Sequence, residues 1–433
     1  MSIHNSKVCL AFIYGKTHKY GTHVLIGYLE KIPYLSKYVD VYLVRNEEVQ
    51  VLSELARKYK LRILAHSLLT TYVAENLDYI RRITRLAKEK GFISIAGGPH
   101  ASGDPLGTLK SLGFDYCIVG EGEEPLAEFI YRVINNDDVF KTRGLAYLSN
   151  DKLVINQKFR VSDLDRYPPY AEEHGLFNPI EISRGCIYAC KFCQVSYMFT
   201  TCVRHRSIDN IVDYSYKLIK RGIKDVRFIA PDSFGYGSSG KQWRPEAVIE
   251  LIDKLQKIRR LGGRIYLGTF PSEVRPEHVT SELIREIRGR VDNKRIIIGA
   301  QTGSERLLKL LGRGHTPQDV IDAVEILIKY GFKVDVDYIF GLPWENEDDI
   351  EATINHMKKV TSLGGRVHAH VFLPLPGTPL AWAPPGRIPT VVRKFIYRLL
   401  GQGYLYGQWE RQEKLASKIA LLRDKGIILP KLR

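Results

Sequence analysis

The chain has 433 residues, of which 44% are apolar, so it is long enough for two or three domains that each bury a core. No stretch approaches the roughly 18 consecutive apolar residues of a membrane span, and six cysteines are too few for a disulfide scaffold. The N-terminus has no basic segment followed by a long apolar one, so we expect a cytoplasmic protein without a membrane partner. The net charge of +16 would attract polyanions such as RNA, although a solvated basic surface has the same composition.

Short apolar β-rich runs alternate with amphipathic helical stretches over residues 1–140. Strands are expected at 8–14, 39–44, 62–67, 93–98 and 116–121, and helices near 22–31, 47–59, 74–90 and 123–135. This alternation predicts an α/β domain with a doubly wound parallel sheet, whose ligand lies at the carboxyl ends of the strands. Residues 141–175 combine a hairpin sequence with the turn-rich DLDRYPPY, and we expect a linker.

A second series of alternating elements occupies residues 176–385. Strands are expected at 180–185, 225–231, 264–270, 295–301, 333–341 and 366–372, and helices near 207–221, 246–260, 279–288, 304–311, 317–330 and 347–361. Six such units are too few for a closed eight-stranded barrel. They predict an open, partial (β/α)6 barrel of the TIM type, with the chemical groups at the carboxyl ends of its strands.

The last segment, 386–433, is predicted to be a small basic helical extension. Residues 387–433 carry 11 Lys and Arg against 3 Asp and Glu, a local charge of +8, and aromatic residues are interleaved with them. Such a mixture can follow a nucleic-acid backbone while stacking on its bases. A helix pair that packs its aromatic side chains onto the barrel explains the pattern as well.

Three of the six cysteines, Cys186, Cys190 and Cys193, fall within eight positions directly after a predicted strand and Gly185. One loop can therefore direct three thiolates to one site. Three ligands on a four-iron cluster leave one iron open for chemistry. The alternatives are structural zinc, with Cys202 as the fourth ligand, and cysteines that only pack. Cys202 itself is either a reactive thiol or a packing residue.

The sequence Cys186-Ile-Tyr-Ala-Cys190-Lys-Phe-Cys193 resembles the CxxxCxxC signature of the radical SAM superfamily. This resemblance implies that the three cysteines hold a 4Fe-4S cluster and that S-adenosylmethionine chelates the fourth iron through its amino and carboxylate groups. An electron then cleaves S-adenosylmethionine to a 5′-deoxyadenosyl radical, which requires a reductant such as ferredoxin or flavodoxin and a low-oxygen environment. Phe192 would lie beside the adenine, unless it is a packing residue.

Downstream segments are similar to the same superfamily, and IIGAQTGSERLLKLLGRGHT resembles its methylthiotransferase branch. The resemblance implies that Asp232 contacts the methionyl amino group and that Gln301, Ser304 and Arg313 face the ribose and carboxylate of the cofactor. An arginine bidentate to a carboxylate makes physical sense. Gly341 would bring backbone close to the adenine. A helix cap at Ser304, a surface Arg313 and a plain turn at Gly341 are the alternatives.

The N-terminal region resembles the cobalamin-binding domain that precedes many radical SAM cores. The resemblance rests on IAGGPHASGDP and CIVGEGEEPL, and it implies cofactor contacts at Ser67, Gly97 and Gly98. His18 stands where related domains carry a cobalt ligand. Lys16 replaces the aspartate that would orient that histidine, and a cation cannot accept the imidazole N–H, so His18 is either a cobalt ligand or a loop histidine.

Residues 1–175 contain only Cys9 and Cys117, so we expect no second, sulfur-donating cluster of the methylthiotransferase kind. The resemblance as a whole implies a radical SAM enzyme that uses cobalamin to methylate an unactivated carbon. Cobalamin-independent radical modification of tRNA or protein is the first alternative, with RNA as a partner of the basic C-terminus. A non-catalytic iron–sulfur or nucleic-acid-binding protein is the second. The substrate is not defined by the sequence.

Overall fold

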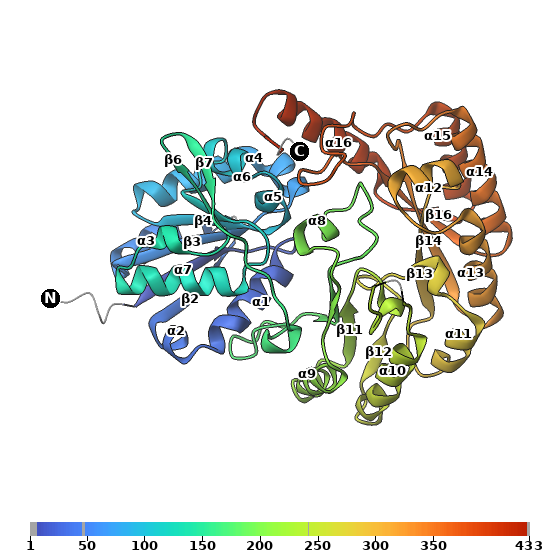
Figure 1. Ribbon diagram of the computed structural model, residues 1–433, viewed down its shortest axis with the longest axis horizontal. Coiled ribbons are helices and arrows are strands. Elements are labelled where there is room, and N and C mark those ends of the chain that lie inside the picture. The colour runs from blue at the N-terminus through green and yellow to red at the C-terminus, as the bar shows by residue number, and fades with distance from the viewer. Residues whose placement is uncertain (1–6, 46–47, 241, 431–433) are drawn as a thin grey trace.

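The computed structural model describes residues 7–45, 48–240 and 242–430. An N-terminal α/β domain lies beside a curved α/β body, and the C-terminal helix spans both (Figure 1). The first residue of the helix expected at 47–59, the N-terminal residues 1–6 and the last three residues of the expected C-terminal extension lie outside the description.

The N-terminal domain contains a seven-stranded sheet in the order β2-β1-β3-β4-β5-β6-β7. Its strands are β1 (Val8–Ile13), β2 (Val39–Val44), β3 (Leu61–Ser67), β4 (Ile93–Gly97), β5 (Tyr116–Ile118), β6 (Leu145–Ser149) and β7 (Lys152–Ile155). The first five are parallel, which confirms the predicted doubly wound sheet. Its helices are α1 (Lys19–Glu30), α2 (Pro33–Tyr38), α3 (Val51–Lys58), α4 (Thr70–Glu89), α5 (Gly98–Gly103), α6 (Pro105–Lys110) and α7 (Glu123–Asn135).

The hairpin within residues 141–175 is part of this sheet and not a separate linker. β6 pairs antiparallel with β5, where Cys117 faces Ala146, and β7 pairs with β6. Farther along, Val161, Leu164 and Tyr167 pack against Tyr28 of α1. The hairpin covers an edge strand that would otherwise expose unpaired backbone groups, which explains why it joins the sheet.

The second body is an open barrel of parallel strands, as predicted. Its strands are β8 (Ile180–Glu181), β11 (Asp225–Ile229), β12 (Arg264–Tyr266), β13 (Arg295–Gln301), β14 (Lys333–Phe340), β15 (Arg366–Val371) and β16 (Leu405–Tyr406). β8, β11 and β12 form one sheet and β13 to β16 another, and a parallel bridge joins Val274 to Ile298. β9 (Ser183–Arg184) and β10 (Arg204–His205) form a separate antiparallel pair.

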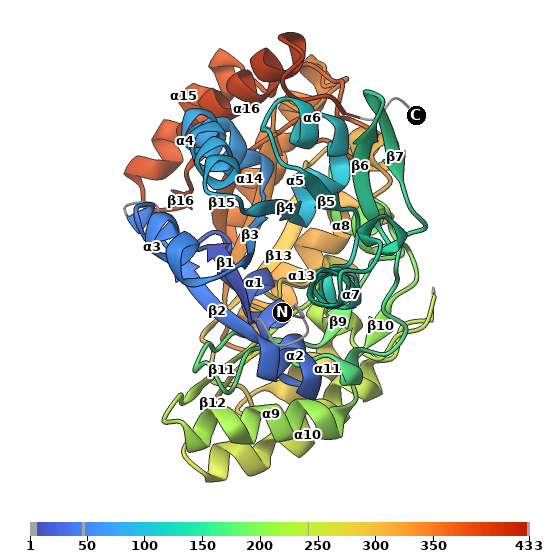
Figure 2. The same ribbon diagram turned by 90° about the vertical axis from the view of Figure 1, so that its left-hand side faces the viewer.

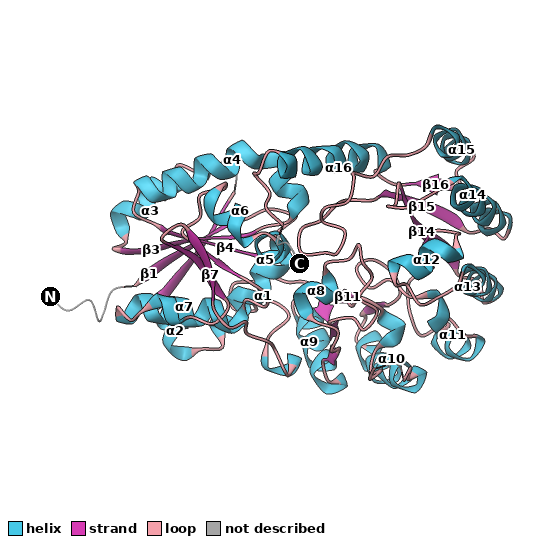
Figure 3. Cartoon of the chain, turned by 45° about the horizontal axis from the view of Figure 1, so that its top comes forward, coloured by secondary structure: helices cyan, strands magenta, loops and turns pink. Residues whose placement is uncertain are grey.

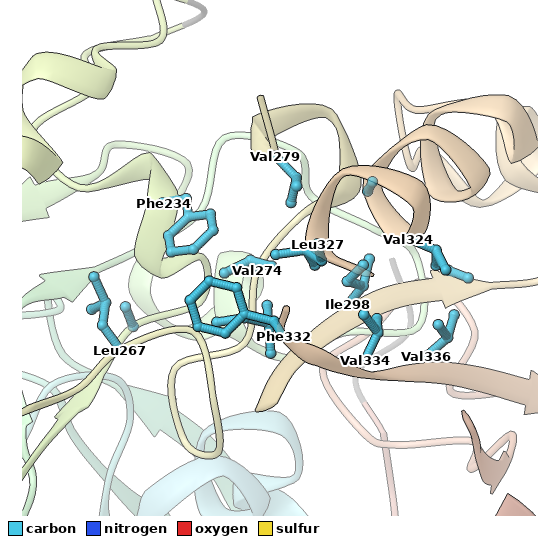
Figure 4. Close-up of a cluster of buried hydrophobic side chains, with 14 of the residues drawn as sticks. Phe234, Leu267, Val274, Val279, Ile298, Val324, Leu327, Phe332, Val334 and Val336 are labelled. Carbon is cyan, nitrogen blue, oxygen red and sulfur yellow. The ribbon is translucent and has the colours of Figure 1, made fainter. Parts of the chain in front are cut away.

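Helices cover the outer face of the barrel (Figure 1), and two of them lie below the N-terminal domain when the molecule is viewed from that side (Figure 2). They are α9 (Ile208–Lys220), α10 (Pro245–Arg260), α11 (Ser281–Ile287), α12 (Glu305–Leu311), α13 (Pro317–Lys329) and α14 (Glu347–Ser362), while the short α8 (Val195–Phe199) follows the cysteine loop. Between strands and helices lies a buried apolar core, in which Val334 and Val336 of β14 meet Leu327 of α13 (Figure 4). Because side chains alternate along a strand, the neighbouring positions face the barrel interior.

The C-terminal segment differs in part from the predicted helical extension. It contains α15 (Thr390–Gly401) and α16 (Trp409–Asp424), but between them β16 pairs with β15 and adds a seventh strand to the barrel. Phe395 and Trp409 fill the core, whereas Tyr397 and Tyr404 are exposed. Among the helices in the described ranges, none combines the length and the apolar character needed to cross a membrane.

Helix α16 also contacts the N-terminal domain, where it continues along the line of α4 (Figure 3). Leu415, Ile419 and Leu422 bury apolar surface together with Ala74 of α4. Arg411 donates to the Glu75 carboxylate at 2.8 Å through two nitrogens. The C-terminal segment therefore joins the two domains on the side opposite the chain crossing near residues 170–180.

Candidate functional site

The three cysteines follow β9 in one loop between the barrel and the N-terminal domain. Gly185 has a φ of 88°, and a Cβ there would lie 2.6 Å from the Cys202 carbonyl oxygen, so this entry to the loop requires glycine. The Cys193 N–H donates to the Cys190 carbonyl at 2.9 Å. Burial raises the pKa of Cys186 and raises that of Cys193 to about 11, and the neighbouring thiols act in the same direction. The cysteines bind a metal as thiolates, and the binding of a cation would offset the cost of deprotonating these buried thiols.

The alternative of a single zinc ion needs a fourth ligand besides the three cysteines of the loop. Cys202, the alternative fourth ligand, is exposed.

Two buried arginines form a positive wall beside this loop. Arg313 donates from Nη2 to the Gly299 carbonyl at 2.7 Å and from Nη1 to Cys190 Sγ at 3.6 Å. Its Nε has no hydrogen-bond partner in the part of the chain that the structure describes. Arg275 lies over the Tyr188 ring, 3.3 Å from its centroid, and donates to the Arg313 carbonyl. Arg275 was not predicted as a site residue, because no motif distinguishes it in the sequence.

Asp232, at the end of β11, lines a small cavity together with Cys186. Its carboxylate accepts from the Arg275 backbone N–H at 3.2 Å and lies 2.6 Å from His278 Nδ1. His278 in turn stacks on Trp243 at 5.2 Å. Asp232 is thus held rigidly near the cluster loop, and its contact with an amino group of the cofactor remains a prediction.

Gln301 ends β13 with a φ of 73°, and it lines a cavity of about 290 Å³ together with Phe192. Both its Nε2 and Arg313 Nη2 lie close to Gly299. A Cβ at Gly299 would lie 2.7 Å from Gln301 Nε2 and 3.3 Å from Arg313 Nη2. The structure therefore brings Phe192, Gln301, Arg313 and Cys190 into one region at the carboxyl ends of the strands.

The structure shows which groups of the chain Ser304 and Gly341 contact, and their contacts with the cofactor remain predictions. The buried Ser304 hydroxyl caps α12 by accepting from the Leu307 N–H at 3.2 Å, and it donates to Asp349 at 2.5 Å. Gly341 has a φ of 69°, and a Cβ there would lie 2.4 Å from the Arg387 nitrogen. A cap and a close chain crossing thus explain these residues.

A second cavity, of about 310 Å³ and mostly apolar, lies at the carboxyl ends of the N-terminal strands. Ser67, Gly97 and Gly98 line it, as predicted for a cofactor site, and barrel residues such as Arg184 close it from the other side. A Cβ at Gly97 would meet nothing within 4 Å, so the backbone here leaves space for a ligand. An apolar cavity with a few polar groups suits a large cofactor tail.

His18 is not among the residues that line this cavity, and its role as a cobalt ligand remains a prediction. It is buried behind His66, with ring centroids 4.9 Å apart, and against Tyr72 at 4.3 Å. Desolvation lowers its pKa to about 4. His66, which the sequence analysis missed, lines the cavity, and neither ring nitrogen has a hydrogen-bond partner among the described residues. The one feature of the sequence that could have indicated His66 is its position directly before Ser67, a predicted cofactor contact.

A buried ion network forms the wall between the cavity and the cysteine loop. Arg184 pairs with Glu121 at 2.9 Å, with Glu123 at 2.7 Å and with Glu181 at 2.7 Å, and Arg204 pairs with Glu121 at 2.6 Å. Buried charges are tolerated only when they are paired in this way. The network links the N-terminal domain to the barrel immediately before Gly185.

The comparisons with known sequences agree with this arrangement. The sequence model of the radical SAM superfamily matches residues 180–357, and that of the B12 binding domain matches residues 6–130. An uncharacterised protein of Methanocaldococcus jannaschii is 29% identical over a match that covers 65% of this chain and 63% of that protein, so the chain spans less than two thirds of its length. A putative methylthiotransferase of the same organism is 26% identical, with 77% of this chain and 70% of that protein covered.

Solved structures share the fold. TsrM of Kitasatospora setae, described as a radical S-adenosylmethionine methyltransferase with cobalamin and a 4Fe-4S cluster bound, matches with a TM-score of 0.69 and 16% identity, covering 87% of this chain and 74% of that one. The cobalamin-dependent S-adenosylmethionine radical enzyme OxsB matches with a TM-score of 0.67 and 16% identity, covering 95% and 57%. The radical SAM domain implies a 4Fe-4S cluster and S-adenosylmethionine, and the B12-binding domain supports cobalamin. The chain therefore carries a radical SAM domain over residues 180–357, preceded by a B12-binding domain over residues 6–130.

Proposed function

We propose that the protein binds a 4Fe-4S cluster through Cys186, Cys190 and Cys193, together with S-adenosylmethionine and cobalamin, and methylates an unactivated carbon of its substrate. When bound, these groups supply a 5′-deoxyadenosyl radical that removes a hydrogen atom and a methyl group that replaces it. The chain's own residues bind and orient the cofactors.

The observation that carries the proposal is the wall shared by the two cofactor regions. Arg184 lines the 310 Å³ cavity and directly precedes Gly185 and Cys186. Its three glutamate partners fix this wall from both domains. A reaction that needs a radical source and a methyl source at one substrate requires such adjacency.

Four side chains would orient S-adenosylmethionine. The Arg313 guanidinium, with one nitrogen unpartnered, would hold its carboxylate, and Asp232 its amino group. Gln301 and Phe192, which share the 290 Å³ cavity, would contact the ribose and the adenine. The substrate would occupy the remainder of that cavity, toward the barrel interior.

The test is an anaerobic reconstitution with iron and sulfide, followed by S-adenosylmethionine, a strong reductant and either hydroxocobalamin or none. We expect 5′-deoxyadenosine in both cases, and S-adenosylhomocysteine only with cobalamin. Cys190→Ala should abolish 5′-deoxyadenosine, whereas Cys202→Ala, at an exposed thiol, should not. Deoxyadenosine without any cobalamin binding would instead favour cobalamin-independent radical chemistry. Cluster assembly without either product in the presence of candidate substrates would favour a binding protein.

The proposed partners are an electron donor such as ferredoxin or flavodoxin and, for a polynucleotide substrate, RNA. RNA is supported by the local charge of +8 and by the exposed Tyr397 and Tyr404, but Phe395 and Trp409 are committed to the core. Binding of RNA by this surface should weaken steeply with salt and weaken further in a Tyr397→Ala/Arg398→Ala variant. Salt-insensitive or unchanged binding would remove RNA as a partner.

A further inference from the structure

The interior face of the barrel carries an aspartate and two histidines that the proposed chemistry does not use. Asp337 of β14 lies opposite His368 of β15 in the strand register, and His370 follows two positions later on the same face. The alternating residues Val367 and Ala369 are buried in the core, which fixes the direction of the two imidazoles. Three potential metal ligands therefore converge from two rigid strands.

The ligand atoms are spaced as they would be around one ion. Asp337 Oδ1 lies 2.8 Å from His368 Nδ1, which lies 3.1 Å from His370 Nε2, and that nitrogen lies 3.7 Å from Asp337 Oδ1. Ligands held at about 2.0–2.2 Å from a tetrahedral or octahedral ion are separated by about 2.8–3.6 Å. No rearrangement of the strands is needed to accommodate an ion.

Hydrogen bonds among Asp337, His368 and His370 cannot account for all the short contacts between them. His368 Nδ1 is within hydrogen-bonding distance of both Asp337 and His370, yet it carries at most one hydrogen. The Val371 N–H donates to Gln412 Oε1 at 2.8 Å, so the Gln412 amide nitrogen faces His370 Nδ1 at 3.3 Å. Because His370 Nδ1 accepts from this amide, the ring carries its hydrogen on Nε2. If His368 Nδ1 carries the hydrogen donated to Asp337, two N–H groups face each other across 3.1 Å. A cation between the three atoms removes the conflict.

The surroundings favour a cation with an open coordination position. Burial raises the pKa of the nearby Glu273 carboxyl to about 7, and the charge of Asp337 acts in the same direction. His368 stacks on Tyr406 with centroids 4.3 Å apart, which holds the ring in place. Asp337 and His370 line the 290 Å³ cavity that also contains Phe192, so the remaining positions of the ion face the substrate space.

We propose that Asp337, His368 and His370 bind a divalent transition metal, with zinc the ion best matched to two imidazoles and one carboxylate, and that its open position takes an oxygen or nitrogen of the substrate. Coordination through His370 Nε2 moves the hydrogen of that ring to Nδ1. A shift of the Gln412 side chain then lets its oxygen, which has two lone pairs, accept from both this N–H and the Val371 N–H, as outer acceptors of metal-bound histidines do.

The experiment uses the enzyme with its 4Fe-4S cluster assembled, incubated with zinc sulfate and passed through a desalting column. Elemental analysis should find about one zinc per chain, and X-ray absorption at the zinc edge should show nitrogen and oxygen neighbours at about 2.0–2.2 Å without sulfur at about 2.3 Å. Asp337→Asn and His370→Gln should lose the zinc at unchanged iron content. His174→Gln, an exposed histidine paired with Glu30, is the matched control and should retain it.

Gln412→Glu supplies a permanent acceptor for the His370 Nδ1 hydrogen and should bind zinc about 10-fold more tightly. This variant keeps the proposal testable if the ligand variants fail to fold. Absence of zinc from the wild-type enzyme, sulfur neighbours that reveal zinc at the cysteines, or equal retention in Asp337→Asn would each overturn the proposal. All of these readouts are independent of methylation, so the proposed function stands or fails separately.

Discussion

Substitution of Gly97 by leucine tests the assignment of the 310 Å³ cavity as the cobalamin site. Gly97 has a φ of −145°, which any residue adopts, and its missing Cβ faces open space in the cavity lining. A leucine side chain there would occupy space that the cofactor needs. Overpacking of this kind costs about 1–3 kcal/mol, which corresponds to about 5-fold to 150-fold weaker binding.

The same substitution has the opposite effect on stability. The leucine side chain enters an apolar cavity and gains up to about 2 kcal/mol from burial, so the free energy of unfolding of the cofactor-free protein should stay constant or rise. The assay is titration with hydroxocobalamin followed by absorption, beside urea denaturation. Gly401→Leu is the matched control, because Gly401 is exposed in α15 and its Cβ would also meet nothing. Unchanged cobalamin affinity in a folded Gly97→Leu protein would refute the assignment.

Three further predictions concern stability. Arg184→Met should lower the free energy of unfolding by about 3–5 kcal/mol in urea denaturation, because Glu123 and Glu181 lose their arginine partner and Glu121 keeps only Arg204. A loss no larger than that of the exposed Arg264→Met would contradict this. Burial raises the pKa of Asp104 from 3.8 to about 6, so its contribution is present below pH 4 and is lost as the pH rises through 6, a change of about 3 kcal/mol. Asp104→Asn should remove this slope, and a slope that persists would assign it to other groups. Ser304→Ala should cost about 1 kcal/mol of stability in the same assay and leave the dissociation constant of S-adenosylmethionine unchanged, since the structure shows a helix cap; weakened binding would restore the predicted contact.

The order of the elements could be predicted from the sequence because the alternation of strands and helices is a local pattern. The five parallel strands of the first domain and the strands of the barrel follow directly from it. The pairing of β6 with β5 and of β16 with β15 could not be predicted, because such short segments carry too little pattern and depend on exposed sheet edges far away in the chain.

The site shows the same division between local and long-range information. Cys186, Cys190 and Cys193 lie in one loop, so their spacing alone places them together. His66 and His18 illustrate the limit, because which imidazole reaches the cavity depends on how α1 packs against β3. Asp337, His368 and His370 lie on two strands, and only the register of the sheet brings them together. Arg275 likewise meets Arg313 only through the packing of segments that are distant in the sequence.

Because α16 packs on α4, the C-terminal end of the chain returns to the N-terminal domain. The polypeptide passes from the first domain to the second near residue 175 and returns along α16, and beyond the end of this helix the Leu429 N–H donates to Asp104 at 2.9 Å. Separation of the domains therefore requires both the contacts of α16 and the buried Arg184 network to break, and each keeps the other at a high effective concentration. A single backbone cut between the domains should therefore leave both halves associated through these contacts.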